Sequence, residues 1–174
     1  MLKKLLLVLM VSVSLFAGNY EKGLEAAQRG DYQTALKLWN IAAEQGNSVA
    51  QYSLGLLYVN GLGVKQNYKE AFKWYKLAAQ QGDPHAQTDL GNMYINGQGV
   101  KQDYKEAAKW YKKAAKLGEP SSQLNLGVMY YNGQGVQQNK IESYKWFLKS
   151  AKQGNLDAQH NLDILCKNSP WACK

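Results

Sequence analysis

Residues 50–85 read AQYSLGLLYVNGLGVKQNYKEAFKWYKLAAQQGDPH, and residues 86–121 read AQTDLGNMYINGQGVKQDYKEAAKWYKKAAKLGEPS. The two segments agree at most of their distinctive positions, and residues 122–157 repeat the pattern a third time. A repeat of this length is typical of stacked helix pairs, because each unit buries its apolar face against its neighbours. The sequence therefore predicts an all-α fold of antiparallel helix pairs.

The positions shared by the three repeats predict where each helix begins and ends. Asn67, Asp103 and Asn139 precede the second helix of each pair and are expected to cap it. Gly82, Gly118 and Gly154 are expected to end the same helices, since glycine adopts the left-handed conformation there. The buried sets are listed in repeat order: Ala50, Ala86 and Ser122; Leu54, Leu90 and Leu126; Trp74–Tyr75, Trp110–Tyr111 and Trp146–Phe147.

The combined pattern is A-x-x-x-L-G-x-x-Y-x-x-G-x-G-V followed by A-x-x-W-Y-x-x-A-A-x-x-G. It resembles the Sel1-like repeat, a relative of the tetratricopeptide repeat. The resemblance covers residues 50–157 and half a unit on each side, and it implies a right-handed α-solenoid. The expected division begins with a signal peptide (1–17). One repeat domain (18–174) follows, made of an N-terminal degenerate unit (18–49), three full repeats (50–85, 86–121 and 122–157) and a C-terminal capping half-repeat (158–174).

The first 17 residues predict export. Lys3 and Lys4 precede an apolar run, Leu5–Phe16, that is too short to cross a bilayer of about 30 Å as a helix. Cleavage after Ala17 would release a periplasmic or secreted chain without a transmembrane segment; an uncleaved interfacial anchor is the alternative. Removal of this segment lowers the basic residues from 21 to 19 against 13 acidic ones, a moderately basic balance.

The two cysteines, Cys166 and Cys173, both lie near the C-terminus. In an exported chain an even pair predicts a disulfide. Seven residues of continuous helix would hold the sulfurs too far apart, so the break at Asn168-Ser169-Pro170 is expected to fold the tail back. A redox-active pair is the alternative, but the C-x-x-C spacing is missing.

The sequence offers no residue that we assign as catalytic, no metal site and no cofactor. It has no S-x-x-K, H-E-x-x-H or G-x-S-x-G motif. The chain is also similar in repeat length, export signal and size to cysteine-rich secreted Sel1-repeat proteins to which penicillin binding and β-lactam hydrolysis are ascribed. That resemblance implies β-lactamase activity as the alternative function. The two cysteines that this group places in each unit are replaced here by pairs such as Ala115 and Gln123.

Four lysines, Lys105, Lys109, Lys112 and Lys116, follow one face of the second helix expected in residues 86–121. A solvated outer face is the favoured interpretation, and an anionic lipid or polysaccharide is the alternative ligand. Nucleic acid is not expected as a partner, because exposed aromatic residues are not interleaved with these lysines.

The strongest functional signal lies where the repeats differ. First helices of such solenoids line the concave surface, which commonly binds a partner. The variable positions suit an extended peptide, whose backbone the asparagines can hydrogen-bond. Neutral drift and a structural spacer are the alternatives, and the chain is expected to be a monomer. The candidate partner-binding residues are Tyr52, Ser53, Leu56, Thr88, Asp89, Asn92, Leu124, Asn125, Val128, His160 and Asn161.

Overall fold

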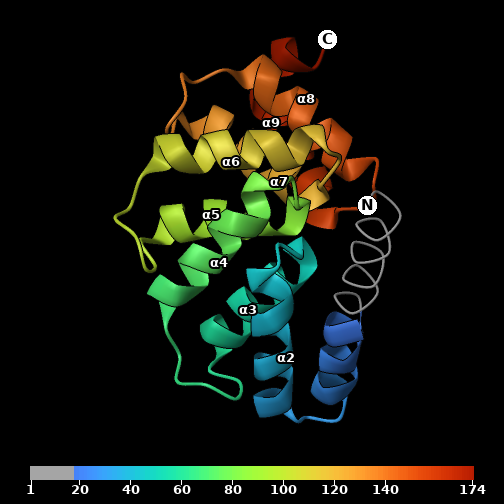
Figure 1. The fold of residues 1–174 in the computed structure, drawn as a ribbon. Helices are drawn as coiled ribbons and strands as arrows, with labels where there is room; N and C mark the ends of the chain where they lie inside the picture. The colour runs from blue at the N-terminus through green and yellow to red at the C-terminus, as the bar shows by residue number, and fades with distance from the viewer. Residues whose placement is uncertain (1–17) are drawn as a thin grey trace, which may run out of the picture. The chain divides into compact units, whose positions relative to one another are not determined.

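A computed structural model describes residues 18–174, and every regular element within that range is helical (Figure 1). This confirms the all-α class predicted from the repeats. The predicted signal peptide, residues 1–17, lies outside the described residues. The chain forms two compact units that divide between Gln81 and Gly82, and we describe each unit by itself.

Unit 1 contains a helix over residues 18–28, followed by α2 (Tyr32–Glu44), α3 (Ser48–Asn60) and α4 (Tyr68–Gln80). Its core joins Trp39 and the small residues of α2 to Leu54 and Leu57 of α3. Asp31 caps α2, since its carboxylate accepts a hydrogen bond from the Thr34 backbone N–H at 3.1 Å.

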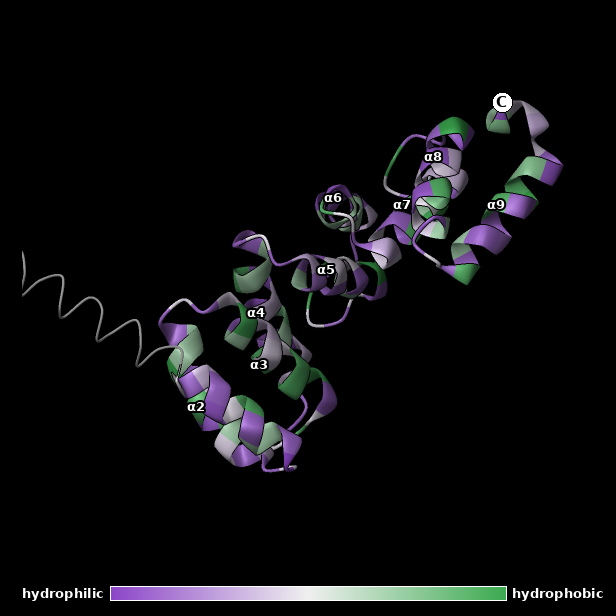
Figure 2. Cartoon of the chain, turned by 90° about the vertical axis from the view of Figure 1, so that its right-hand side faces the viewer, coloured by the Kyte–Doolittle hydropathy of each residue, from purple (hydrophilic) through white to green (hydrophobic). Residues whose placement is uncertain are grey.

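Unit 2 contains two antiparallel helix pairs, followed by a single helix and a short tail. Its elements are α5 (Pro84–Asn96), α6 (Tyr104–Lys116), α7 (Pro120–Asn132), α8 (Lys140–Ala151), α9 (Leu156–Asn168) and the 3-10 helix η1 (Pro170–Cys173). Coloured by hydropathy, the helices show apolar and polar residues alternating along their length (Figure 2). The first helices begin at Ser48, Pro84 and Pro120, two residues before the starts of the repeats as numbered from the sequence (50, 86 and 122).

The predicted caps of the second helices are confirmed. Asn67, Asp103 and Asn139 each accept hydrogen bonds from two backbone N–H groups of the helix that follows. Such bonds satisfy donors that have no partner within the helix. Gly82 and Gly118 have φ of 95° and 97°, as expected for residues that end a helix in the left-handed region.

Two glycines allow close approach between neighbouring segments. In α5, a Cβ added to Gly91 would lie 2.6 Å from Cε1 of Tyr111, so α6 packs against bare backbone there. In the turn of unit 1, Gly63 has φ of 67°, and a Cβ would meet the Tyr32 carbonyl oxygen at 2.6 Å. The second glycine of the G-x-G turn is therefore needed both for its backbone conformation and for contact with the preceding second helix.

The repeat tryptophans are covered, as the packing argument requires. Trp39, Trp110 and Trp146 are 5–9% exposed, and Trp74 is half-buried against the core of unit 1. Within residues 18–174 no helix is both long and apolar enough to cross a membrane.

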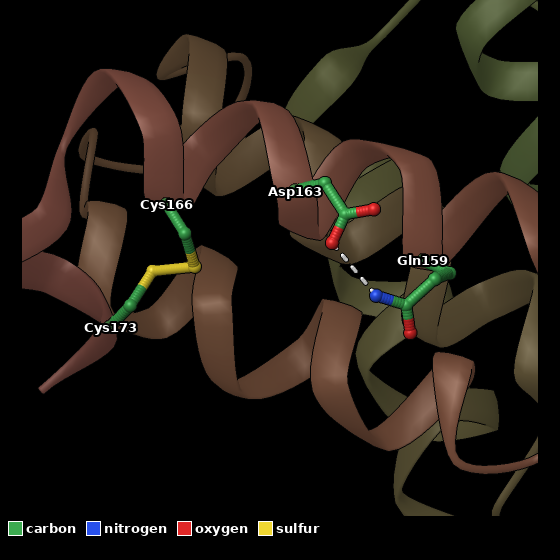
Figure 3. The surroundings of a disulfide bond; sticks show 4 residues. All are labelled: Gln159, Asp163, Cys166 and Cys173. Atoms are coloured by element: carbon green, nitrogen blue, oxygen red, sulfur yellow. Dashed lines mark hydrogen bonds between the residues drawn. A yellow bond between two sulfur atoms is a disulfide. The ribbon is translucent and has the colours of Figure 1, made fainter.

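The C-terminal tail folds back on the last helix, as predicted. Cys166 and Cys173 form a disulfide with a Cα–Cα distance of 5.7 Å (Figure 3). Ala172 is buried in a cluster with Phe147, Leu162 and Leu165. The tail therefore contributes to the core of unit 2.

Candidate functional site

The first helices of unit 2, α5, α7 and α9, present related residues at the same register. One row contains Asp89, Asn125 and Asn161, and the row one turn later contains Asn92, Val128 and Ile164. All of these side chains are half-buried except that of Ile164, which is 40% exposed. We call the residues Asp89, Asn92, Leu124, Asn125, Val128, His160 and Asn161 the first-helix face.

A buried tyrosine connects this face to α6. The Tyr111 hydroxyl donates a hydrogen bond to Oδ1 of Asn92 at 2.6 Å, and it also interacts with the side chain of Asn125. Burial raises the pKa of Tyr111 well above its ordinary value, so the hydroxyl stays protonated and available as a donor. Asn92 also donates to Oδ1 of Asp89 at 3.3 Å. The first-helix face is thus held by hydrogen bonds between α5, α6 and α7.

The junction between α7 and α9 lacks this arrangement. Phe147 occupies the position of Tyr111 and has no hydroxyl, and Val128 occupies the position of Asn92. A pocket of about 170 Å³ lies there, lined by Val128, Tyr131, Asn132, Phe147, Asn161 and Ile164.

Two residues expected on the partner-binding strip lie in the interior instead. Thr88 and Ser53 are each only 8% exposed. The Thr88 hydroxyl donates to the Pro84 carbonyl and lies 2.7 Å from the Ser122 hydroxyl of the neighbouring first helix. The Ser53 hydroxyl donates to the Val49 carbonyl. Thr88 is covered because the following first helix packs on it, whereas His160, on the last first helix, is exposed.

The remaining candidates in unit 1 are only partly accessible. The Tyr52 ring stacks on Tyr75 with a centroid separation of 5.5 Å and is half-buried. Leu56 is 36% exposed. Within unit 1, Leu56 therefore offers the accessible apolar surface that was expected on this strip.

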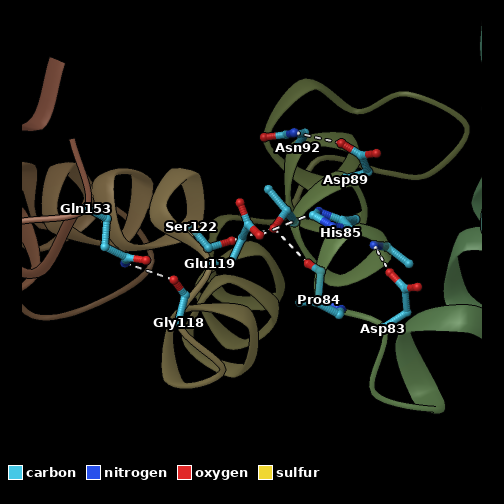
Figure 4. A network of polar contacts seen from close by, with 11 residues as sticks. Asp83, Pro84, His85, Asp89, Asn92, Gly118, Glu119, Ser122 and Gln153 are labelled. Carbon is cyan, nitrogen blue, oxygen red and sulfur yellow. Dashed lines mark hydrogen bonds and ion pairs between the residues drawn. The ribbon is translucent and has the colours of Figure 1, made fainter. Parts of the chain in front are cut away.

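Beside the first-helix face, His85 and Glu119 form a polar contact between α5 and the residue before α7. His85 Nδ1 lies 3.5 Å from Oε2 of Glu119 (Figure 4). Glu119 stands at the N-cap of α7 but makes no capping bond with its side chain. The sequence analysis did not identify this pair.

Positive charge in unit 2 is concentrated on the second helices. Helix α7 has no charged side chain, whereas α6 and α8 together have eight lysines: Lys105, Lys109, Lys112, Lys113, Lys116, Lys140, Lys145 and Lys149. The ammonium groups of Lys113 and Lys149 lie 3.9 and 4.5 Å from the ring centroids of Trp110 and Trp146. These lysines cover aromatic surface in addition to carrying charge.

Sequence reasoning missed most of the α7/α9 pocket. Phe147 was assigned to the core, and Asn132 and Ile164 were not considered. The available signal was that Phe147 is the one phenylalanine at a position where Tyr75 and Tyr111 stand in the other repeats. Among residues 18–174, no group of three or more His, Cys, Asp or Glu side chains is arranged to hold a metal ion.

Known proteins share the repeat pattern and the fold of this chain. The model of the Sel1 repeat family matches residues 15–47, 48–83, 84–119 and 120–155. No curated protein matches the chain.

Several solved structures share the fold. The chain is 38% identical to a protective antigen of uropathogenic Escherichia coli strains, with a TM-score of 0.84 over 88% of this chain and 34% of the antigen. It is 32% identical to a Sel1 repeat protein from Oxalobacter formigenes, with a TM-score of 0.83 over 89% of this chain and 63% of that one. Cysteine-rich protein B of Helicobacter pylori is 27% identical, with a TM-score of 0.55 over 82% of this chain and 96% of its own. The chain thus spans about a third of the first relative and under two thirds of the second.

Proposed function

Because the chain belongs to the Sel1 repeat family, we propose that it is an exported scaffold whose first-helix face binds a protein or peptide partner. The observation that carries this proposal is the row formed by Asp89, Asn125 and Asn161 across three successive first helices. Carboxamide groups both donate and accept hydrogen bonds, so such a row suits the regularly spaced amide groups of an extended backbone.

The distribution of charge supports this choice of surface. The first helices of unit 2 have three aspartates and one lysine, while the second helices have eight lysines and two glutamates. Lysine-covered faces keep such a protein soluble, whereas a half-buried face with few charges loses less hydration when a partner covers it.

A paired substitution tests the binding surface. The Asn125→Ala and Asn161→Ala changes together should weaken partner binding at least about tenfold, because each removes a hydrogen-bonding group from the interface. The measurement is capture from a bacterial envelope fraction, followed by titration calorimetry with the purified partner. The matched control is Lys112→Ala with Lys116→Ala on α6. Loss of binding in the control and not in the asparagine variant would contradict the proposal.

Export is supported by the charged and apolar start of the sequence and by the disulfide, since disulfides persist in oxidising compartments. We expect the protein isolated from its native bacterium to begin at Gly18 and to be found outside the cytoplasm. Intact-mass measurement after cell fractionation checks this expectation. An unprocessed chain in the cytoplasmic fraction would contradict it.

The enzymatic alternative has a direct test. Purified protein is incubated with nitrocefin, and turnover above background at catalytic protein levels would replace the binding proposal by β-lactam hydrolysis.

A further inference from the structure

The two first-helix junctions of unit 2 differ at one aromatic position and at the first-helix residue that faces it. Between α5 and α7, the Tyr111 hydroxyl fills the junction and bonds Asn92 at 2.6 Å. Between α7 and α9, Phe147 brings the same ring without the hydroxyl, and Val128 provides no acceptor. The space that a hydroxyl and an asparagine occupy in one junction is therefore open in the other.

The polar group at this opening is the side chain of Asn161. Asn161 stands where Asn125 stands one repeat earlier, but within residues 18–174 its side chain makes no hydrogen bond. It lines the pocket together with Val128, Phe147 and Ile164. The pocket thus combines apolar walls with one carboxamide whose donors and acceptor are available to a ligand.

The size and charge of the pocket limit what can enter it. Its volume of about 170 Å³ is close to that of a cavity of about 150 Å³ known to hold benzene, so a leucine or phenylalanine side chain fits. No lining residue carries a charge. The ammonium of Lys140, 5.8 Å from the Tyr131 ring centroid, is already bonded to the Ser169 hydroxyl at 2.8 Å. A charged partner side chain would lose its water here without gaining an opposite charge.

We propose that this pocket anchors an uncharged apolar side chain of the bound peptide, while Asn161 hydrogen-bonds the peptide backbone beside that residue. The inference rests on the proposed function and adds to it the chemistry of the partner. Val128 and Asn161 belong to both the pocket and the first-helix face, so the anchor is continuous with the backbone-binding row. Partners should therefore carry a leucine, methionine or phenylalanine at a fixed position.

The pocket is tested with blocked amino acids as probes. N-acetyl-leucine N-methylamide is titrated against protein labelled at methyl groups, and N-acetyl-lysine N-methylamide is the charged comparison. We expect saturable shifts at Val128 and Ile164 with the leucine probe only, in the millimolar range typical of so small a ligand. Equal shifts with both probes, or none with the leucine probe, would overturn the inference.

Two substitutions close the pocket by introducing the residues that stand at the corresponding positions of the preceding repeat. Val128→Asn with Phe147→Tyr rebuilds the Asn92–Tyr111 contact and should abolish the leucine-probe shifts. Tyr111→Phe, in the other junction, is the matched control and should retain them. If the double variant does not fold, Ile164→Glu places a charge at the exposed rim and should have the same effect. Unchanged shifts in a folded, closed variant would overturn the inference.

Partner binding then separates this inference from the proposed function. The closed-pocket variant is compared with the variant that carries Asn125→Ala and Asn161→Ala. If only the asparagine variant binds the purified partner more weakly than the wild type, the pocket does not anchor the peptide and the proposed function stands. If neither variant weakens partner binding, both are wrong.

Discussion

Two buried serines of α8 stand where the other repeats have alanine, and their surroundings differ. Ser143 and Ser150 are both fully buried. The Ser150 hydroxyl donates to the Pro120 carbonyl at 2.8 Å, whereas the Ser143 hydroxyl has no hydrogen-bond partner in the part of the chain that the structure describes. A buried polar group without a partner keeps its full desolvation cost.

Alanine substitutions at these two positions should therefore have opposite effects. Ser143→Ala should raise the free energy of unfolding by about 1 kcal/mol, because it removes an unsatisfied hydroxyl. Ser150→Ala should lower it by about 1 kcal/mol, because it leaves a carbonyl without its donor. Urea unfolding followed by circular dichroism measures both. A decrease in both variants would show that Ser143 has a partner in solution.

At the scale of single residues, the sequence correctly predicted burial at the positions that all repeats share, such as Ala50 and Leu54. The residues that surround these positions repeat along with them. It placed Ser53 and Thr88 wrongly on the surface. Whether such a side chain is covered depends on which element lies opposite, and the sequence of a single helix does not give that element. The pocket beside Phe147 was missed for a different reason, since losing one hydroxyl leaves the apolar pattern unchanged.

Helix junctions show what replaces the cysteines of the cysteine-rich relatives. The resemblance placed one expected cysteine pair at Ala115 and Gln123, and the structure joins these residues by a hydrogen bond from Gln123 Nε2 to the Ala115 carbonyl at 3.1 Å. Gln51 makes the same bond to Ala43 at 3.0 Å. Gln153 adds a further bond to Gln123 Oε1 at 2.8 Å. A buried carboxamide therefore connects α2 to α3 in unit 1 and α6 to α7 in unit 2.

Gln123→Leu should lower the free energy of unfolding by about 2 kcal/mol, because it removes the hydrogen-bond partner of the buried Ala115 carbonyl in α6 and of the Gln153 carboxamide that follows α8. Gln159→Leu is the matched control at the corresponding position of α9. Gln159 is exposed, and among the described residues its side chain bonds only Asp163 of its own helix, so its loss should change stability by less than about 0.5 kcal/mol. Guanidinium unfolding gives both values. Equal effects would mean that the junction bond contributes little.

Close packing inside a helix pair depends on glycine. Gly91→Ala would normally favour a helix by up to about 1 kcal/mol, but its Cβ would overlap the Tyr111 ring. Overpacking of this kind typically costs about 1–3 kcal/mol, so the variant should be less stable than the wild type. Thermal unfolding measures the difference, and a stabilised variant would show that α6 can move away without loss.

At the element scale, the sequence predicted the helices well because their ends are specified locally. Asn67, Asp103 and Asn139 accept the hydrogen bonds expected of caps, and Gly82 and Gly118 have the expected backbone conformation. The junction glutamines were not predicted as structural. A glutamine is usually exposed, and its burial here follows from the packing of three helices.

At the scale of the whole molecule, a repeat array must end without leaving its last apolar face open. In unit 2, η1 contacts α8 and α9. Ala172 is buried there, and Lys140 of α8 bonds the Ser169 hydroxyl at the start of the tail. The disulfide holds this tail on the end of the unit, in the place of the glycine turn that follows the other first helices.

Replacing Cys166 and Cys173 by serine should lower the free energy of unfolding by about 2 kcal/mol, because the short loop then regains its freedom in the unfolded chain. For a chain of this length that corresponds to a fall in Tm of about 4–8 °C. Amide hydrogen exchange should increase mainly in α9 and η1, since only these elements lose their tether. Adding dithiothreitol to the wild type should reproduce the change, and adding it to the double variant should do nothing further. A wild-type Tm that is insensitive to the reductant, with the thiols shown to be free, would mean that packing of Ala172 alone holds the tail in place.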